Sequence, residues 1–266
     1  MLSLSWLFFD LDLKHNCLII GKLTTHMKTH QLHKWTLSTE EARAIQKNLC
    51  AWVSTAERCQ SPSLVARIEF SSTLDNQGSI QSTVTVKSFP SLGFLERKIG
   101  IKQSNFPRVP GLISFQKAPS AIAALEKLSH SPDLLICDGR GLTGIDSFGV
   151  ASHVGILSNL PTIGIRPPKA RFNYSMLGNT RGDWLPLIED NPNSGVLLRV
   201  IDGLDPLLVS PAHKITQEDA IQQCLTFFPE TIPSREYIEI LYPDTDPYST
   251  EKYNGVGSGP HLKIVS

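Results

Sequence analysis

The stretch that decides the fold is Leu134-Leu135-Ile136-Cys137-Asp138-Gly139-Arg140-Gly141. Four consecutive apolar residues are typical of a short strand that is buried on both faces of a sheet. The strand ends in an aspartate, and the two glycines that follow permit a tight turn and a close approach of backbone to a ligand. In open α/β sheets, ligands bind beyond the carboxyl ends of the strands. The stretch therefore predicts an α/β fold with Asp138 at a ligand-binding edge.

The sequence on both sides of this stretch predicts one mixed sheet. A capping box at Ser38–Glu41 begins an amphipathic helix over 39–56. Three strands with turn signals between them follow, and beyond Gly111 helices alternate with short strands, a pattern typical of a sheet with helices on its faces. The expected strands are 64–70, 79–88, 92–101, 134–137, 161–165, 196–201 and 207–210, and the expected later helices are 118–130, 148–160 and one from Thr216 to Phe228.

Composition limits the possible functions. The chain has 266 residues, is 41% hydrophobic and 19% charged, and has no net charge. No apolar run approaches the roughly 18 residues of a membrane-spanning helix, so we expect no membrane partner. The part after Phe228 carries a charge of −3 and the rest +3, which permits phosphate binding without strongly indicating it. Five cysteines without a CxxC motif favour a reducing compartment, the cytoplasm.

Three side chains are candidates for chemistry, and each has an ordinary alternative. Asp138 suits a hard cation such as Mg²⁺, which prefers oxygen ligands, but an Asp-Gly turn is also common. Glu69 lies near the end of the first predicted strand, where an exposed glutamate would be unremarkable. His213 precedes the helix capped by Thr216, and a histidine there can simply contact the backbone of a loop.

Two further segments could contact a ligand. Pro107-Arg108-Val109-Pro110 is a kinked stretch that could act as a wedge, or could be a connection stiffened by proline. Arg166, Lys169 and Arg171 follow a predicted strand and could contact phosphates, or could form a solvated basic loop.

The ordered motifs of residues 37–242 resemble the endonuclease V family. The similar segments are Pro110–Phe115, Pro132–Gly141, Gly149–Gly155, Leu160–Ile165 and Pro206–Ile215. The resemblance leaves residues 1–36 as an N-terminal extension that we expect to lack a fold of its own, and residues 243–266 as a C-terminal tail.

This resemblance implies a ribonuclease H-like fold and an inosine-directed nuclease. Members of the family use Mg²⁺, with Mn²⁺ as an alternative, to cut DNA or RNA strands that contain inosine, a reaction of DNA repair or RNA turnover. Metal ions in such nucleases activate water and stabilise the attacking and leaving oxygens. The inosine base leaves the stack and enters a pocket.

Transferring the family's residues gives a mixed result. Asp138 matches a metal-ligand aspartate, Glu69 stands where the family's Gly-Val-Asp-Val-Ser has its aspartate, and His213 matches a late histidine. Gly139 and Gly141 match the loop that approaches the base. This assignment makes Glu69 and Asp138 the metal ligands, with His213 positioning the attacking water.

Four positions depart from the family pattern. Lys117 replaces a metal-ligand glutamate, Arg108 replaces the wedge tyrosine, Pro167 replaces a lysine and Gly144 a histidine. At about 4 Å and an effective dielectric near 20, each pair of unit charges interacts by about 4 kcal/mol, so Lys117 disfavours a divalent cation nearby. Among the other acids, Asp146 is the best placed to substitute for the missing glutamate.

Two hypotheses therefore remain open. The chain is either an Mg²⁺-dependent endonuclease or a nucleic-acid-binding homologue that has lost cleavage, with Lys117 neutralising the former metal site. In both, the wedge Pro107, Arg108, Val109 and Pro110 and the glycine loop contact the strand, and in the second hypothesis Lys117 attracts a phosphate. The departures favour the second hypothesis for chemistry, and family resemblance favours the first.

Overall fold

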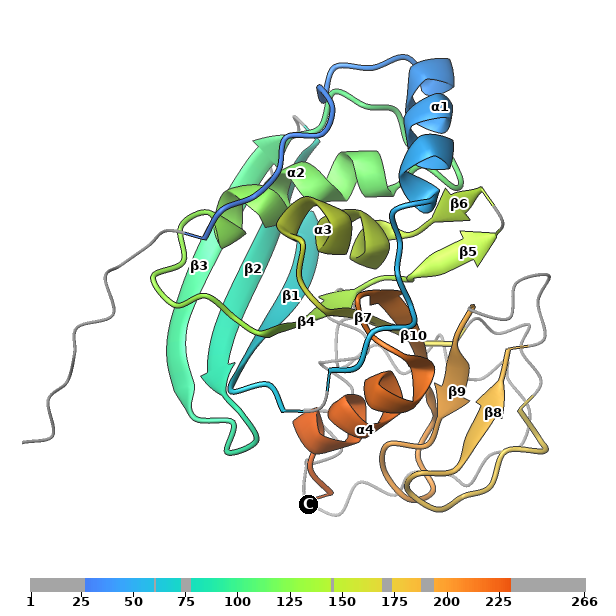
Figure 1. Cartoon of the computed structure of the whole chain (residues 1–266). Coiled ribbons are helices and arrows are strands. Elements are labelled where there is room, and N and C mark those ends of the chain that lie inside the picture. The colour runs from blue at the N-terminus through green and yellow to red at the C-terminus, as the bar shows by residue number, and fades with distance from the viewer. Residues whose placement is uncertain are drawn as a thin grey trace, which may run out of the picture.

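The computed structural model describes residues 27–59, 61–72, 78–144, 146–168, 174–187 and 194–230 (Figure 1). Within these ranges an eight-stranded sheet carries helices on both faces, and a two-stranded hairpin lies beside it. The strands of the large sheet are β1 Leu64–Ser72, β2 Ser79–Ser88, β3 Phe94–Gln103, β4 Leu134–Asp138, β7 Thr162–Arg166, β8 Trp184–Pro186, β9 Val196–Leu198 and β10 Leu207–His213. The hairpin is β5 Leu142–Gly144 with β6 Ser147–Phe148, and the helices are α1 Thr39–Cys50, α2 Ser114–Leu125, α3 Val150–Ser158 and α4 Gln217–Phe227.

The sheet is mixed, as the sequence predicts. Its order is β3-β2-β1-β4-β7-β10-β9-β8, in which β1, β4 and β7 run parallel to one another and the remaining neighbours are antiparallel. The central position of β4 and β7 explains their continuous apolar sequences, because both of their faces are covered.

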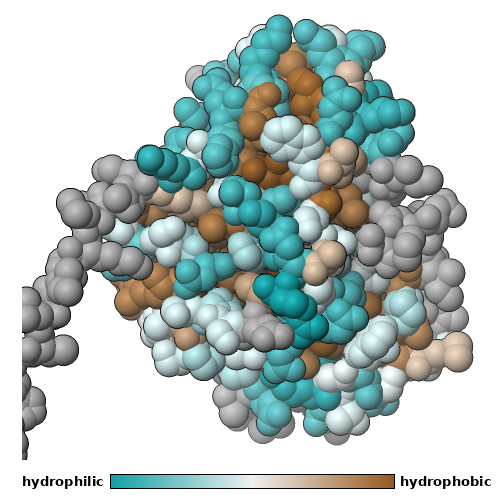
Figure 2. All heavy atoms as spheres, in the orientation of Figure 1, coloured by the Kyte–Doolittle hydropathy of each residue, from teal (hydrophilic) through white to brown (hydrophobic). Residues whose placement is uncertain are grey.

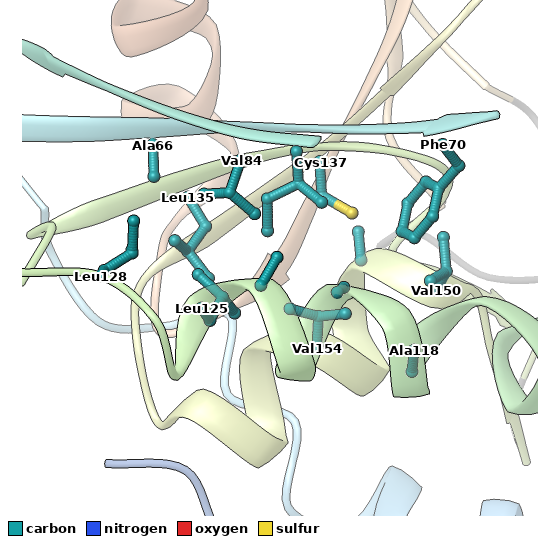
Figure 3. Close-up of a cluster of buried hydrophobic side chains, with 14 of the residues drawn as sticks. Ala66, Phe70, Val84, Ala118, Leu125, Leu128, Leu135, Cys137, Val150 and Val154 are labelled. Carbon is teal, nitrogen blue, oxygen red and sulfur yellow. The ribbon is translucent and has the colours of Figure 1, made fainter. Parts of the chain in front are cut away.

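Helices cover the two faces of the sheet with separate hydrophobic clusters. On one face, Ala118 and Leu125 of α2 and Val154 of α3 pack with Leu135 and Cys137 of β4 (Figure 3). On the other face, α4 contributes a cluster that contains Ile136 of β4; its helical members are Ala220, Cys224 and Phe227. Successive residues of β4 therefore point to opposite layers, as expected of a strand.

The ends of two helices differ from the prediction. In α1 the capping box is present, with the Ser38 hydroxyl accepting from the Glu41 N–H at 3.2 Å, but the helix ends at Cys50 rather than near 56. Helix α2 begins four residues before the predicted start and ends at Leu125 instead of 130. Its N-cap, Ile113, makes no side-chain bond, so the sequence carries no capping signal there.

Some strands were not predicted, or are longer than predicted. β5, β6 and β8 are only two or three residues long, too short for a period-2 pattern. β10 continues past Ser210 through Pro211 to His213, with an irregularity in register between Pro211 and His213. Proline lacks an N–H but is tolerated at such bulges, so here it does not end the strand.

Residues 27–36 form neither helix nor strand, yet they pack on the helices. Met27 is buried, the His30 N–H donates to the Leu157 carbonyl at 2.7 Å, and the Thr29 hydroxyl donates to Glu126 at 2.5 Å. These contacts attach the last part of the expected N-terminal extension to α2 and α3. Residues 1–26 and the expected tail at 243–266 lie outside the described residues.

The surface mixes hydrophilic and hydrophobic residues on the face drawn in Figure 2, where the hydrophobic ones lie in several separate patches. In the part of the chain that the structure describes, no helix combines the length and the hydropathy that crossing a membrane requires.

Candidate functional site

The ends of β1 and β4 bring Glu69 and Asp138 together. The two strands are parallel neighbours, and their register pairs Ile68 with Cys137. The next residue on each strand is Glu69 and Asp138, respectively, so the two carboxylates stand side by side on the same sheet face. Both side chains are partly exposed, and the negative charge of Glu69 acts on Asp138. The predicted pair of acids at this edge is therefore present.

A buried arginine occupies the space beside these acids. Arg67 lies two residues before Glu69 on β1 and is only 5% exposed. Its Nη2 forms an ion pair with Oδ1 of Asp138. Both terminal nitrogens are buried, and among the described residues neither makes a hydrogen bond of normal geometry, so Nη2 meets Asp138 as an ion pair only. Asp138 is thus not a free carboxylate.

The charges around Asp138 nearly balance. Burial raises the pKa of Asp138; the positive charge of Arg67 opposes this, the negative charge of Glu69 adds to it, and Lys117 also opposes it. The net direction of the pKa is upward. Two acids and two bases therefore share this strand edge, with no net charge.

Lys117 reaches this edge from the first turn of α2. Its Nζ lies over the ring of Phe70 at 4.9 Å from the centroid, a cation–π contact. Phe70 belongs to β1 and lies near Val150 at one end of the cluster drawn in Figure 3. Helix α2 has no acidic residue in its first turn. The N-terminus of a helix carries a partial positive charge, which adds to the positive charge of Lys117. An anion bound there would therefore be stabilised both by Lys117 and by the helix.

The glycine loop is tightly packed. The Gly139 N–H donates to the Ile165 carbonyl at 2.8 Å, and the Gly141 N–H donates to the Ser210 hydroxyl at 2.9 Å. A Cβ atom on Gly139 would lie 2.2 Å from Cγ1 of Val150, and one on Gly141 would lie 2.3 Å from the carbonyl oxygen of Pro211. Packing alone therefore requires both glycines, whatever ligand the loop approaches.

The predicted wedge connects β3 with α2. Arg108 is exposed, and the Val109 N–H donates to the Pro107 carbonyl at 2.9 Å. Beneath it, Phe106 is buried against Phe115 of α2, with ring centroids 5.6 Å apart. The wedge is therefore a rigid surface feature that presents a cation rather than an aromatic ring.

The structure does not bring His213 to these acids, contrary to the prediction. β10 is antiparallel to β7 and pairs His213 with Thr162, whereas Asp138 pairs with Ile165. Three residues of strand separate these positions by about 10 Å, at opposite ends of β7. His213 is buried there beside Gly155, and burial lowers its pKa to about 4.

The described residues do not fit a site for a divalent metal ion. Mg²⁺ requires several oxygen ligands in near-octahedral geometry. No three His, Cys, Asp or Glu side chains among the described residues are grouped so that they could hold a metal ion. Asp138 is paired with Arg67, and Asp146, the predicted substitute, forms an ion pair with Lys47 of α1 at 3.0 Å.

Sequence reasoning missed Arg67. The signal was present, because a charged residue two positions before Glu69 must share its strand face. Of the basic residues predicted after β7, Arg166 ends that strand, and Lys169 and Arg171 lie outside the described residues. Pro167 is described, directly after the strand, and Gly144 ends β5.

Comparison with known proteins gives one consistent result. The sequence model of the family described as Endonuclease V matches residues 47–235. The endonuclease V of Trichormus variabilis is 36% identical over 205 residues, 77% of this chain and 92% of the relative. That of Roseiflexus castenholzii is 37% identical over 210 residues, 77% of this chain and 93% of the relative.

Solved structures agree with the sequence comparison. The crystal structure of endonuclease V from Streptomyces avermitilis has a TM-score of 0.70 and 30% identity, covering 82% of this chain and 97% of that one. A Ciona intestinalis endonuclease V, crystallised with a 24mer DNA containing an inosine, has a TM-score of 0.61 over 76% of this chain and 97% of its own. At 19% identity this second likeness shows the fold alone. The predicted ribonuclease H-like fold is confirmed.

Proposed function

The chain belongs to the endonuclease V family, and from this premise we propose that it binds inosine-containing strands of DNA or RNA without cutting them by metal-assisted hydrolysis. The observation that carries the proposal is the ion pair between Arg67 and Asp138. This ion pair engages Oδ1 of Asp138 and holds a buried positive charge beside the carboxylate, which repels a divalent cation such as Mg²⁺ or Mn²⁺ at the same position.

Recognition of the strand rests on the parts of the site that do not need a metal. The Ciona relative was crystallised with inosine-containing DNA, and this chain shares its fold. We assign the backbone of Gly139 and Gly141 to the base and the exposed wedge Pro107–Pro110 to the neighbouring strand. Lys117, in the first turn of α2, and Arg108, in the wedge, supply positive charge to phosphates. His213 has no part in this proposal, because it lies at the other end of β7.

The second candidate function is cleavage. This candidate is favoured by the 36% identity between this chain and the endonuclease V of Trichormus variabilis. In that case Glu69 and Asp138 would hold Mg²⁺ against the positive charge of Arg67, which contacts Oδ1 of Asp138. The placement of Lys117 and the absence of a third ligand among the described residues speak against this candidate.

One assay separates the two functions. The purified full chain is mixed with labelled oligonucleotides that differ only by one inosine in place of guanosine, in EDTA and separately in Mg²⁺. We expect tighter binding of the inosine strand, equal in both buffers, and no shortened product on a denaturing gel.

Two outcomes would contradict the proposal. Cleavage in Mg²⁺ that EDTA abolishes would establish the nuclease, and equal affinity for both strands would refute inosine recognition. DNA and RNA versions of both oligonucleotides are run in parallel to determine which strand the chain prefers.

A further inference from the structure

The side chain of Arg67 extends along β1 toward Asp138. The register of β1 and β4 places Arg67 beside Ile136, two residues before Asp138. Two residues of strand span about 6.6 Å, a distance that a long arginine side chain can cover. The guanidinium therefore lies at the level of Glu69 and Asp138, next to the carboxylates that would otherwise face each other.

Its surroundings indicate that Asp138 holds it in place. Arg67 is buried, and neither Nη1 nor Nη2 makes a hydrogen bond of normal geometry among the described residues. Burying a guanidinium charge is costly, and the ion pair between Nη2 and Asp138 is the contact that offsets this cost. A nearby cation favours the ionised form of two neighbouring acids, and here the chain supplies one from its own sequence.

We infer that Arg67 is a built-in replacement for the metal ion, and that Arg67 and Lys117 exclude divalent cations independently of each other. This inference rests on the proposed function, in which the chain lacks metal-assisted cleavage. Arg67 occupies a ligand of the former site, whereas Lys117 opposes the cation from the opposite helix layer. Either Arg67 or Lys117 alone is enough to exclude a divalent cation from the carboxylates. Replacing only one of these bases therefore leaves the cation excluded by the other.

The two bases can be removed one at a time by substitution. Glycine at position 67 has no side chain that could extend to Asp138, so Arg67→Gly removes the ion pair. Opening the site to a metal ion then requires Arg67→Gly to free Asp138 and Lys117→Glu to exchange the second positive charge for a third carboxylate. Lys117→Glu alone would place a third carboxylate beside an Asp138 that is still paired.

The test measures metal binding in four proteins without any nucleic acid. Mn²⁺ is titrated into the unmodified chain, the two single variants and the double variant, and free Mn²⁺ is followed by electron paramagnetic resonance. We expect the double variant to bind Mn²⁺ at least about tenfold more tightly than any of the other three proteins. Equal affinity in Lys117→Glu and the double variant would overturn the inference, as would tight binding by the unmodified chain.

Two controls keep the result interpretable. Because glycine can destabilise a strand, Arg67→Met with Lys117→Glu repeats the double reversal with a side chain that fills the same space. Asp138→Asn added to either double variant should abolish the gained binding. A folded double variant, judged by circular dichroism, that gains no Mn²⁺ affinity with either residue at position 67 would also refute the inference. Failure of the unmodified chain to bind inosine strands would refute the proposed function while leaving this result standing.

Discussion

His33 and His153, 120 residues apart, share a hydrogen bond between their Nε2 atoms at 2.8 Å. The Lys34 carbonyl, 2.9 Å from Nδ1 of His33, can only accept, so that nitrogen carries the hydrogen. Nε2 of neutral His33 therefore accepts, and His153 donates. Nδ1 of His153 is buried without a partner among the described residues, so in this arrangement it carries no hydrogen. The pair fastens residues 27–36 to α3 only while His33 is neutral, because a protonated His33 would oppose a second donor to the Nε2–H of His153.

Acidification should loosen this attachment. Burial lowers the pKa of His33, and burial together with the charge of His33 lowers that of His153 well below the ordinary value of 6.5. The unfolded segment therefore binds protons more readily, and the stabilisation is complete above pH 6.5 and is lost as the pH falls further. Hydrogen exchange of residues 27–36, corrected for the intrinsic rate, should show decreasing protection below about pH 6.5.

The control for this prediction is His33→Phe. This variant keeps an aromatic ring beside Trp35 but removes the acceptor, so protection of 27–36 should be low already at neutral pH and should change little on acidification. His213→Gln removes another histidine whose pKa is lowered by burial. This variant therefore tests whether acidification acts through His213 on the whole fold rather than through the histidine pair. Unchanged protection of the segment in the unmodified chain at pH 5 would show that the histidine pair does not hold it.

Removing the arginine from the Arg67–Asp138 pair should destabilise the fold. Arg67→Met leaves the largely buried Asp138 carboxylate without its cation, at a cost of about 3 kcal/mol in the free energy of unfolding. Adding Asp138→Asn should recover much of this loss, because no unpaired charge then remains. Urea unfolding of the two single variants and the double variant at neutral pH measures the coupling between the residues. Strictly additive effects would contradict the ion pair.

The sequence predicted the positions of the strands at this site, but it did not predict the direction of β10. Hydrophobic pattern identifies β1 and β4, and because these neighbouring strands are parallel, their carboxyl ends meet at one edge. The family resemblance assigned His213 to the same site, but β10 is antiparallel to β7 and carries His213 to the other edge. Strand direction depends on pairing between distant segments, which no local pattern encodes.

The Arg67–Asp138 contact could not be predicted from residue types alone. Shared strand parity puts Arg67 on the face of Glu69, yet an arginine there could equally turn toward solvent. In the structure Arg67 lies on the sheet face that α4 covers, where its positive charge opposes the rise that burial causes in the pKa of Cys224 on α4. The position of α4 follows from the whole sheet, so the ion pair is a tertiary property.

Filling the space at Gly164 should disturb strand binding. A Cβ atom there would lie 2.6 Å from the Gly139 carbonyl oxygen, so Gly164→Ala pushes the Gly139–Gly141 loop off β7. We expect a loss of about 1–3 kcal/mol in stability, as for other overpacked cores, and weaker binding of the inosine oligonucleotide. Gly155→Ala is the matched control, because its Cβ would meet His213 and Thr162 instead, 2.7 and 2.9 Å away. Equal affinity losses in both variants would show that the loop has no special role.

Replacing the wedge arginine should weaken binding through charge rather than through base recognition. Arg108 is exposed and carries no aromatic ring, so we expect it to contact a phosphate. Arg108→Gln should then weaken binding of inosine and guanosine strands by the same factor and reduce the dependence of log affinity on log salt by about 0.7 for a single strand. Lys214→Gln removes a charge at the end of β10 where His213 lies, and should leave affinity and salt dependence unchanged. A loss confined to the inosine strand would instead mean that the guanidinium stacks in the gap left by the base, and the wedge would then be a recognition element.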